Sequence, residues 1–269
     1  MTDDLPGFLP VARDLALQAG ARLNELLHTE LVQTRKKDRS LVTNADHDAN
    51  EILRSGLRRA FPEHAVISEE TGPEGPESEY VWLIDPLDGT RAFARGESGF
   101  SVMLGLLKNE RPVLGVVYDP LEGHLYEAYR EGGCFHTFQG ARRRVRVSDR
   151  SEWRDMPLIT STGFPEQLKS RLQDRMPTPH VKPVNSVGVK VGYMVRGLAD
   201  IYVNHHPVHY WDTCGPLVIL QEAGGRMTLW DGLPLAYRLS AGLRHPGPTL
   251  ATNGCRHDDI LRVLAIPTS

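Results

Sequence analysis

The chain has 269 residues, a formal net charge of −3 and an isoelectric point near 6.4. This length supports one large domain or two small ones, and the charge excludes a global basic surface of the kind that binds nucleic acid polymers or membranes. The three cysteines form no CxxC pair, which is typical of a reducing compartment rather than a disulfide scaffold. No signal-like N-terminus is present and no window approaches the roughly 18 apolar residues of a membrane span, so we expect a cytoplasmic protein.

Two amphipathic helices are predicted at the start of the chain. Apolar residues recur at helical spacing over 9–27, and the basic stretch QTRKKDRS at 33–40 is expected to be a loop. A second helix is predicted over about 44–60, because Thr43 and Asp46 have the spacing of a capping box.

A large sheet is predicted to follow. HAVIS at 64–68 is expected to be a short strand with Glu69 at its tip, and 80–84 a buried strand. Four further apolar segments are separated by short polar turns, which predicts an antiparallel meander. These segments are SVMLGLL (101–107), PVLGVVYD (112–119), HLYEAY (124–129) and CFHTF (134–138).

The second half of the chain alternates predicted strands and helices. Residues 141–157 are basic and then irregular, so we place a domain boundary there, between an α+β part at 1–145 and an α/β part at 146–269. Strands are predicted at PLIT (157–160), ADIYVN (199–204), GRMTLW (225–230) and GPTLAT (247–252), and helices at KVGYMVRG (190–197), TCGPLVILQEAGG (213–225) and DDILRVLA (258–265).

The stretch WLIDPLDGTRAF at 82–93 carries the first chemical signal. Pro86 disfavours the helical region for Asp85, so the strand is expected to end in a turn. In a type I turn the first and fourth residues lie within about 7 Å, and Asp85 and Asp88 could then point to one place. Two carboxylates this close repel each other, which raises the pKa of one of them unless a cation lies between them, and that cation is commonly divalent.

Other acidic residues stand at comparable places. Glu69 ends a strand and Asp212 begins a helix, and hard oxygen ligands of this kind suit Mg²⁺. Two such ions can activate a water and stabilise a leaving oxygen in phosphoryl transfer. The backbone at Gly89 and Thr90 can open a helix toward a phosphate. Taken singly, each residue is as well explained by an ordinary turn, a helix cap or a solvated charge.

Four stretches together resemble one known superfamily: LVTNADHDANEIL (41–53), ISEE (67–70), WLIDPLDGTRAF and YWDTCGPLVILQEAGG (210–225). In order and spacing they are similar to the lithium-sensitive, Mg²⁺-dependent phosphatases that include inositol monophosphatases, fructose-1,6-bisphosphatases and bisphosphate nucleotidases. The resemblance covers most of the chain. It implies a layered αβαβα sandwich and two or three Mg²⁺ ions. It also implies metal ligation by Glu69, Asp85, the Leu87 carbonyl, Asp88 and Asp212, and a water oriented or deprotonated by Asp46 and Thr90 with Glu69 as a further catalytic group.

The resemblance also bears on the substrate. RGE (95–97), GVVYDPLEGHLY (115–126) and NSVGVKVG (185–192) look more like the 3'(2'),5'-bisphosphate nucleotidase branch than like inositol monophosphatase. That branch implies hydrolysis of 3'-phosphoadenosine 5'-phosphate, with Ser186 and Lys190 joining Asp88, Gly89, Thr90 and Asp212 as substrate contacts. A solvated surface charge is the alternative for Lys190. ITSTGFPEQ (159–167) departs from the branch, because Gly163 stands about where nucleotidases carry a histidine.

Several alternatives stay open. Inositol-1-phosphate, histidinol phosphate and fructose-1,6-bisphosphate are alternative substrates, and a non-catalytic regulatory protein on the same fold is the alternative of a different class. The haloacid dehalogenase type of phosphatase is disfavoured, because its aspartate pair is Asp-x-Asp rather than Asp-x-x-Asp. A transition-metal site at His205, His206 and His209 is a minor alternative. The expected partner is a small phosphorylated metabolite, and a homodimer is one option for the assembly.

Overall fold

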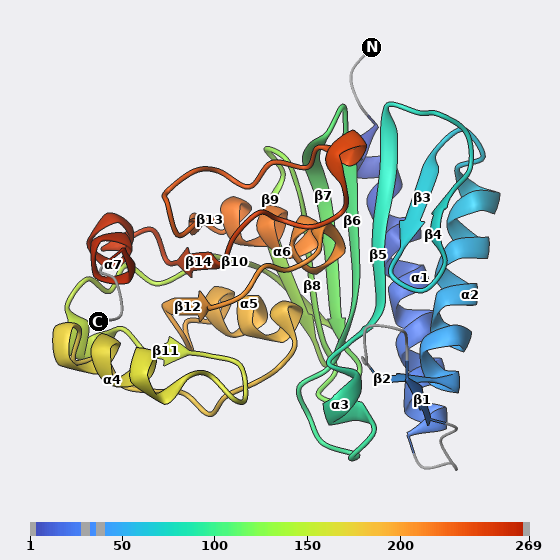
Figure 1. The fold of residues 1–269 in the computed structure, drawn as a ribbon. Helices are drawn as coiled ribbons and strands as arrows, with labels where there is room; N and C mark the ends of the chain where they lie inside the picture. The colour runs from blue at the N-terminus through green and yellow to red at the C-terminus, as the bar shows by residue number, and fades with distance from the viewer. Residues whose placement is uncertain (1–3, 28–32, 36–40, 266–269) are drawn as a thin grey trace.

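The computed structural model describes residues 4–27, 33–35 and 41–265, and it stacks five layers of helices and sheets. Figure 1 shows α1 and α2 on one face of an upright eight-stranded sheet, and α5 and α6 between this sheet and a smaller one. The predicted αβαβα sandwich is therefore confirmed. The helices are α1 (Leu5–Leu26), α2 (Asn44–Ala60), α3 (Thr90–Phe93), α4 (Glu166–Arg175), α5 (Val187–Val195), α6 (Tyr210–Glu222) and α7 (His257–Leu264).

The large sheet has the strand order β10-β9-β8-β7-β6-β5-β3-β4, and its only parallel pair among the described residues is β3 with β5. The predicted meander from β6 to β9 is confirmed. The strands of this sheet are β3 (Ala65–Ser68), β4 (Gly72–Glu74), β5 (Tyr80–Asp88), β6 (Ser101–Lys108), β7 (Arg111–Asp119), β8 (His124–Tyr129), β9 (Gly133–Phe138) and β10 (Ala141–Val145).

Three local features of the first half differ from what the sequence predicts. The expected loop at 33–40 contains β1 (Gln33–Arg35), which pairs with β2 (Leu41–Thr43), while 36–40 lies outside the described residues. Residues 141–145, the basic part of the predicted boundary segment, form β10, an exposed edge strand that was not predicted because its run of arginines hides the usual alternation. Strand β5 does not end in a turn at Asp85, because its pairing with β6 resumes at Asp88 after an irregularity in register.

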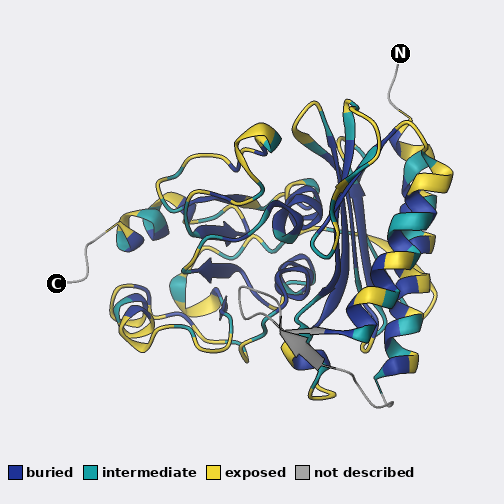
Figure 2. Cartoon of the chain, turned by 45° about the vertical axis from the view of Figure 1, so that its right-hand side comes forward, coloured by how far each residue is buried: buried dark blue, intermediate teal, exposed yellow. Residues whose placement is uncertain are grey.

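Helix α6 approaches the large sheet unusually closely. A Cβ atom on Gly115 of β7 would lie 2.2 Å from the carbonyl oxygen of Gly215 in α6, and a Cβ atom on Gly105 of β6 would lie 2.5 Å from Cys214 Sγ. Only glycine fits at these two positions, since atoms at such distances would overlap. The close packing sets α6 against the middle strands, and Figure 2 shows the strands in the middle of the large sheet coloured mostly as buried.

The smaller sheet has the order β11-β12-β14-β13, with β11 and β12 parallel and the other pairs antiparallel. The predicted α/β alternation holds for the order of elements, but the sheet is mainly antiparallel. Helix α4 was not predicted, because its sequence buries only Leu168 and Leu172 and so shows little apolar periodicity. The strands are β11 (Leu158–Ile159), β12 (Ile201–Asn204), β13 (Arg226–Leu229) and β14 (Thr249–Thr252).

The layer between the two sheets is filled by one apolar cluster drawn from both halves of the chain. It joins Leu83 and Val117 of the large sheet to Tyr202 and Met227 of the small sheet through Ile219 of α6. The division at 145–146 therefore separates parts that share a core, and it stays a prediction. None of the described helices is long and apolar enough to cross a membrane.

Candidate active site

Four acidic side chains from three separate elements meet at one end of the large sheet. Glu69 follows β3, Asp85 and Asp88 lie at the end of β5, and Asp212 lies in the first turn of α6. Burial raises the pKa of Asp85 well above its usual range, and the charges of the other three carboxylates raise it further. The structure thus brings these residues within electrostatic reach of one another, and their role as metal ligands stays a prediction.

Asp88 is held by the first turn of α5. Its Oδ2 atom accepts hydrogen bonds from Ser186 Oγ at 2.8 Å and from the backbone N–H groups of Val187 at 2.6 Å and Gly188 at 3.3 Å. Ser186 is also the N-cap of α5, where its hydroxyl accepts from the N–H of Val189. Burial raises the pKa of Asp88, and the bond from Ser186 opposes that rise. A negative charge at a helix start is stabilised in this way, so α5 fixes the orientation of Asp88.

Asp212 is fixed by a capping box of its own. Its Oδ2 atom accepts the N–H of His209 at 2.7 Å, and the His209 ring stacks on Trp211 with centroids 4.6 Å apart. Burial raises the pKa of Asp212 well above its usual range, and Asp88 and Glu69 add to that rise. The cluster therefore contains more negative charge than the surrounding protein neutralises.

Asp46 and Thr90 form a hydrogen-bonded pair beside this cluster. Asp46 Oδ2 accepts both the N–H and the hydroxyl of Thr43, each at 2.7 Å, which confirms the predicted capping box of α2. Thr90 Oγ1 lies 3.2 Å from Asp46 Oδ1 and 3.1 Å from the Leu87 carbonyl oxygen, so its single proton can go to either acceptor. Burial is the main cause of the raised pKa of Asp46, and the charge of Glu69 contributes.

Gly89 makes the tight turn between Asp88 and Thr90. Its φ of 98° lies in the left-handed region, and a Cβ atom there would stand 2.6 Å from the carbonyl oxygen of Gly99. Helix α3 begins at Thr90 as predicted but has only four residues, so its dipole is small. The turn therefore contributes to the site by placing the backbone N–H groups after Gly89, and the electrostatic field of so short a helix adds little.

Lys190 supplies a cation next to the carboxylates. The side chain is 0% exposed, and Nζ donates to Ser161 Oγ at 2.7 Å and to the Asn185 carbonyl at 2.9 Å. Burial lowers its pKa to about 8, against the opposing influence of Asp88 and Asp212. The alternative of a solvated surface charge is therefore wrong.

The donor set fits a hard divalent cation better than a transition metal. Within residues 4–27, 33–35 and 41–265, no three histidine, cysteine, aspartate or glutamate side chains are arranged to hold an ion by themselves. This finding applies to His205, His206 and His209 and equally to the four acidic residues, so it gives the transition-metal alternative no support. Mg²⁺ usually takes one or two carboxylates and completes its shell with waters and phosphate oxygens, so it does not need such a closed cage.

Comparison with known proteins identifies the family. The sequence profile described as Inositol monophosphatase family matches residues 4–257. The chain belongs to this family. It is 32% identical to an inositol-1-monophosphatase of Synechocystis sp., a match that covers 97% of this chain and 90% of that protein. It is 31% identical to the 3'(2'),5'-bisphosphate nucleotidase CysQ of Escherichia coli, over 79% of this chain and 85% of the relative.

Solved structures agree with this assignment. An inositol monophosphatase from Anabaena (Nostoc) sp. is 31% identical, covers 98% of each chain and has a TM-score of 0.80. An IMPase of Thermotoga maritima is 24% identical, covers 93% of this chain and 94% of its own, with a TM-score of 0.80, and supports the fold alone. The resemblance found in the sequence is confirmed, and the chain is a phosphoric monoester hydrolase of the inositol monophosphatase family.

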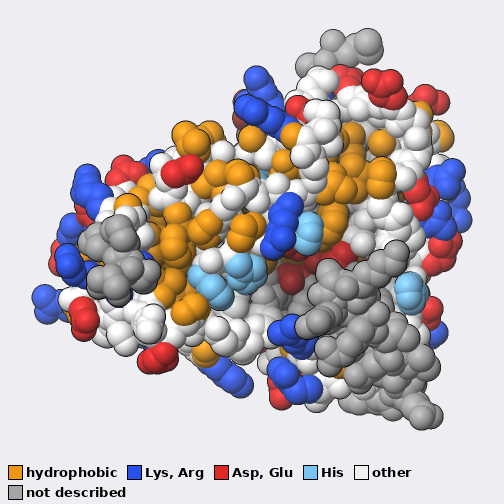
Figure 3. Space-filling view, in the orientation of Figure 1, with side chains coloured by type: hydrophobic (Ala, Val, Ile, Leu, Met, Phe, Trp, Pro, Cys, Tyr) orange, Lys and Arg blue, Asp and Glu red, His pale blue; other side chains and the backbone are white. Residues whose placement is uncertain are grey.

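One rim of the acidic cluster is basic. Arg244 lies opposite His209 in an isolated antiparallel bridge, and its guanidinium donates to the Pro207 carbonyl oxygen from Nε at 3.3 Å and from NH2 at 3.0 Å. Burial lowers the pKa of His206, and the neighbouring His205, Lys190 and Arg244 lower it further, so these groups lie within reach of one another. Figure 3 shows blue and pale blue side chains beside the red acidic group on this face.

Sequence reasoning missed Arg244 and the residues that fix the tip of β3. Arg244 lies in an irregular loop 32 residues after Asp212 (244 − 212) and carries no motif, so only the fold brings it to the site. Ser68 donates to Asn50 Oδ1 at 2.6 Å and accepts the N–H of Glu70 at 3.1 Å, both in buried or part-buried positions. This pair positions the turn that carries Glu69.

Proposed function

We propose that the chain is a Mg²⁺-dependent phosphomonoesterase that removes one phosphate from a small bisphosphorylated metabolite, most specifically 3'-phosphoadenosine 5'-phosphate, giving AMP and phosphate. The observation that carries the reaction class is the meeting of Glu69, Asp85, Asp88 and Asp212 beside the hydrogen-bonded pair of Thr90 and Asp46. A basic rim next to the same carboxylates favours a substrate with a second phosphate.

The acidic cluster fits bound magnesium. Its carboxylates raise one another's pKa, and the buried Lys190 only partly offsets their charge. We propose that the side chains of the four acidic residues and the Leu87 carbonyl hold two or three Mg²⁺ ions. When bound, these ions would supply Lewis-acid stabilisation of the phosphoryl charge.

The pair of Thr90 and Asp46 is suited to activating water. With Thr90 donating its proton to Asp46 Oδ1, the Thr90 oxygen is free to accept a proton from a water on its other side. As the water oxygen bonds to phosphorus, one water proton passes to Thr90 and the Thr90 proton passes to Asp46. The ester P–O bond breaks and the leaving oxygen takes a proton from solvent, so no phosphoenzyme forms. The two hydrogen bonds from Thr43 keep Asp46 oriented throughout.

The second phosphate of the substrate would bind to the basic rim. Ser186 and Lys190, the predicted contacts, are both 0% exposed. We propose that they act through their hold on Asp88 and through positive charge, while the exposed side chains of Arg244 and His206 meet the phosphate directly. A guanidinium that already has one face anchored on Pro207 loses little freedom when it binds a phosphate, which favours this role for Arg244.

The test is phosphate release from 3'-phosphoadenosine 5'-phosphate and inositol-1-phosphate by the wild type and by Arg244→Gln. We expect kcat/KM for the bisphosphate to fall about tenfold, since one charge-assisted hydrogen bond contributes about 1.5 kcal/mol, and kcat/KM for the monophosphate to stay within about twofold. Arg238→Gln, in an exposed part of the same connection, is the matched control. Equal losses on both substrates would refute the assignment of Arg244.

Inositol-1-monophosphatase activity is the second candidate. It is supported by the relatives from Synechocystis sp. and Anabaena (Nostoc) sp., which match nearly the full chain. The same carboxylates would serve it, with the rim contacting sugar hydroxyls. A kcat/KM for inositol-1-phosphate above that for the nucleotide would select this candidate. Absence of phosphate release from either substrate, and from histidinol phosphate and fructose-1,6-bisphosphate, would favour the non-catalytic regulatory alternative.

A further inference from the structure

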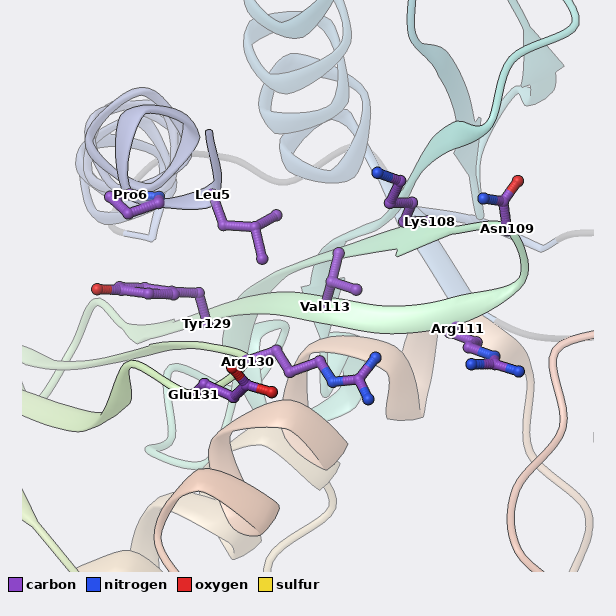
Figure 4. A pocket seen from close by; sticks show the side chains of 9 residues that line it. All are labelled: Leu5, Pro6, Lys108, Asn109, Arg111, Val113, Tyr129, Arg130 and Glu131. Carbon is purple, nitrogen blue, oxygen red and sulfur yellow. The ribbon is translucent and has the colours of Figure 1, made fainter. Parts of the chain in front are cut away.

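A cavity of about 780 Å³ lies at the end of the large sheet opposite to the catalytic carboxylates. Its walls come from the start of α1, the hairpin between β6 and β7, and the end of β8, as Figure 4 shows. On β6, Ser101 pairs with Asp88 at one end, and Lys108 pairs with Tyr80 at the other end and lines the cavity. The cavity is therefore separate from the active site, and its volume lies in the range of small-molecule sites.

The hairpin at the cavity is held in one conformation. Asn109 and Glu110 have φ values of 49° and 59°, the left-handed pair of a type I′ turn. The Asn109 N–H donates to the Glu79 carbonyl at 2.8 Å, and Glu110 Oε1 accepts the N–H of Leu239 at 2.8 Å. Asn109 suits this left-handed conformation, whereas Glu110 adopts it rarely, so the bond of Glu110 to Leu239 helps to stabilise the turn. The turn places Lys108 directly opposite Arg111.

The cavity has an excess of positive charge. Three cations, Lys108, Arg111 and Arg130, line it together with one carboxylate, that of Glu131. Figure 4 shows the Arg130 side chain extending along β7 toward Arg111. Neither arginine makes a side-chain hydrogen bond or ion pair with any residue that the structure describes.

The carboxylates near these arginines bond to backbone N–H groups rather than to the guanidinium groups. Glu222 of α6 accepts the N–H groups of Glu131 and Gly133, each at 2.8 Å. It lines a neighbouring hollow of about 350 Å³ that also contains Arg111 and Arg130. Glu110 is likewise bonded to backbone. Neither guanidinium group therefore forms an ion pair with a carboxylate of the described residues, although Glu131 and Glu222 line the same hollows.

The other lining residues are Asn109 and the apolar or aromatic Leu5, Pro6, Val113 and Tyr129. Leu5 and Val113 are 7% and 4% exposed. The ring of Tyr129 packs over Gly132, where a Cβ atom would stand 2.4 Å from it, so the ring keeps its place. Planar guanidinium groups bind phosphate oxygens in pairs, and an apolar wall beside them suits the organic part of an ester. We propose that this cavity is a second binding site of the phosphatase, which takes a small phosphate monoester with an apolar or aromatic group.

The test uses phenylphosphonate, which carries a dianion and a ring but has no ester bond to hydrolyse. Binding is measured by isothermal titration calorimetry, without divalent cations, on the full chain carrying Arg244→Gln, so that anion binding at the rim of the catalytic site contributes little. The same background carries either Arg111→Gln with Arg130→Gln, or the control pair Arg59→Gln with Arg154→Gln, two exposed arginines elsewhere. Inorganic phosphate is the second probe.

We expect one saturable site for phenylphosphonate in the background protein and in the control pair. In the cavity pair its affinity should fall at least tenfold, with an unchanged thermal midpoint. Inorganic phosphate should bind at least threefold more weakly than phenylphosphonate, because it cannot contact the apolar wall. Equal affinity for phenylphosphonate in the cavity pair and the control pair, or binding that does not saturate, would overturn the proposal. Equal affinity for phenylphosphonate and inorganic phosphate would overturn the claim that the cavity binds the organic group of an ester.

Discussion

Replacing Ser186 with alanine tests how the start of α5 holds the active site. In the structure the Ser186 hydroxyl donates to Asp88 Oδ2 at 2.8 Å and lies 2.8 Å from Ser101 Oγ. It also accepts the N–H of Val189 at 3.1 Å as the helix N-cap. Since its one proton goes to Asp88, Ser101 must be the donor in the bond between the two serines. The alanine variant therefore removes three hydrogen bonds in a fully buried place.

The expected cost follows from these bonds. A hydrogen bond to a buried charge contributes about 1.5–3 kcal/mol, and loss of a serine N-cap costs about 1 kcal/mol. The contributions overlap because they share one side chain, so we expect the free energy of unfolding to fall by about 3 kcal/mol. For a chain of this size that corresponds to a drop in thermal midpoint of roughly 6–12 °C. The catalytic rate should fall as well, because Asp88 loses part of its orientation.

The assay is guanidinium denaturation of Ser186→Ala beside Ser170→Ala, the same change at an exposed position of α4. We expect the control to stay within about 0.5 kcal/mol of the wild type. A loss below about 1 kcal/mol for Ser186→Ala, or one equal to the control, would refute the reasoning that this hydroxyl supports Asp88.

Three further predictions concern packing, proton balance and catalysis. Gly115→Ala should lower the free energy of unfolding by about 3 kcal/mol or more, because its Cβ atom would stand 2.2 Å from the backbone of α6. Gly247→Ala is the control and should be near neutral, because the space around Gly247 is open. Equal denaturation midpoints for the two variants would contradict the close packing of α6. Burial lowers the pKa of His257 to about 4, so below pH 6.5 the unfolded chain takes up a proton that the folded chain refuses, and this residue should cost about 2 kcal/mol of stability by pH 5. In His257→Gln the loss of stability between pH 7 and pH 5 should be correspondingly smaller, and an unchanged pH dependence would count against a neutral buried ring. Thr90→Val should lower kcat about a hundredfold or more with little change in thermal midpoint, because it removes the hydroxyl that links water to Asp46; a near-normal kcat would exclude that proton path.

The sequence was most informative where one local rule decides the structure. The capping box of Thr43 and Asp46 and the meander of β6–β9 depend on spacing and on alternation, and both were predicted. The resemblance to a known motif set also grouped Glu69, Asp85, Asp88 and Asp212, and the structure brings these residues within electrostatic reach of one another.

The errors have a common physical cause, which is that non-local contacts overrode the local signal. Strand β5 continues to Asp88 because β6 pairs with it beyond Pro86. Strand β10 is stabilised by β9 although its arginines give no apolar period. The burial of Lys190 and the position of Arg244 near His209 depend on how distant segments pack. The residue pattern within each segment therefore could not predict them.

The most direct test of the central claim is the steady-state rate of phosphate release from 3'-phosphoadenosine 5'-phosphate, with and without Mg²⁺, for the wild type and Asp88→Asn. The account predicts Mg²⁺-dependent turnover by the wild type, with kcat/KM at least tenfold above that for inositol-1-phosphate, and at least a thousandfold lower turnover in the variant with its fold retained. Turnover that survives Asp88→Asn, or that does not need a divalent cation, would contradict it.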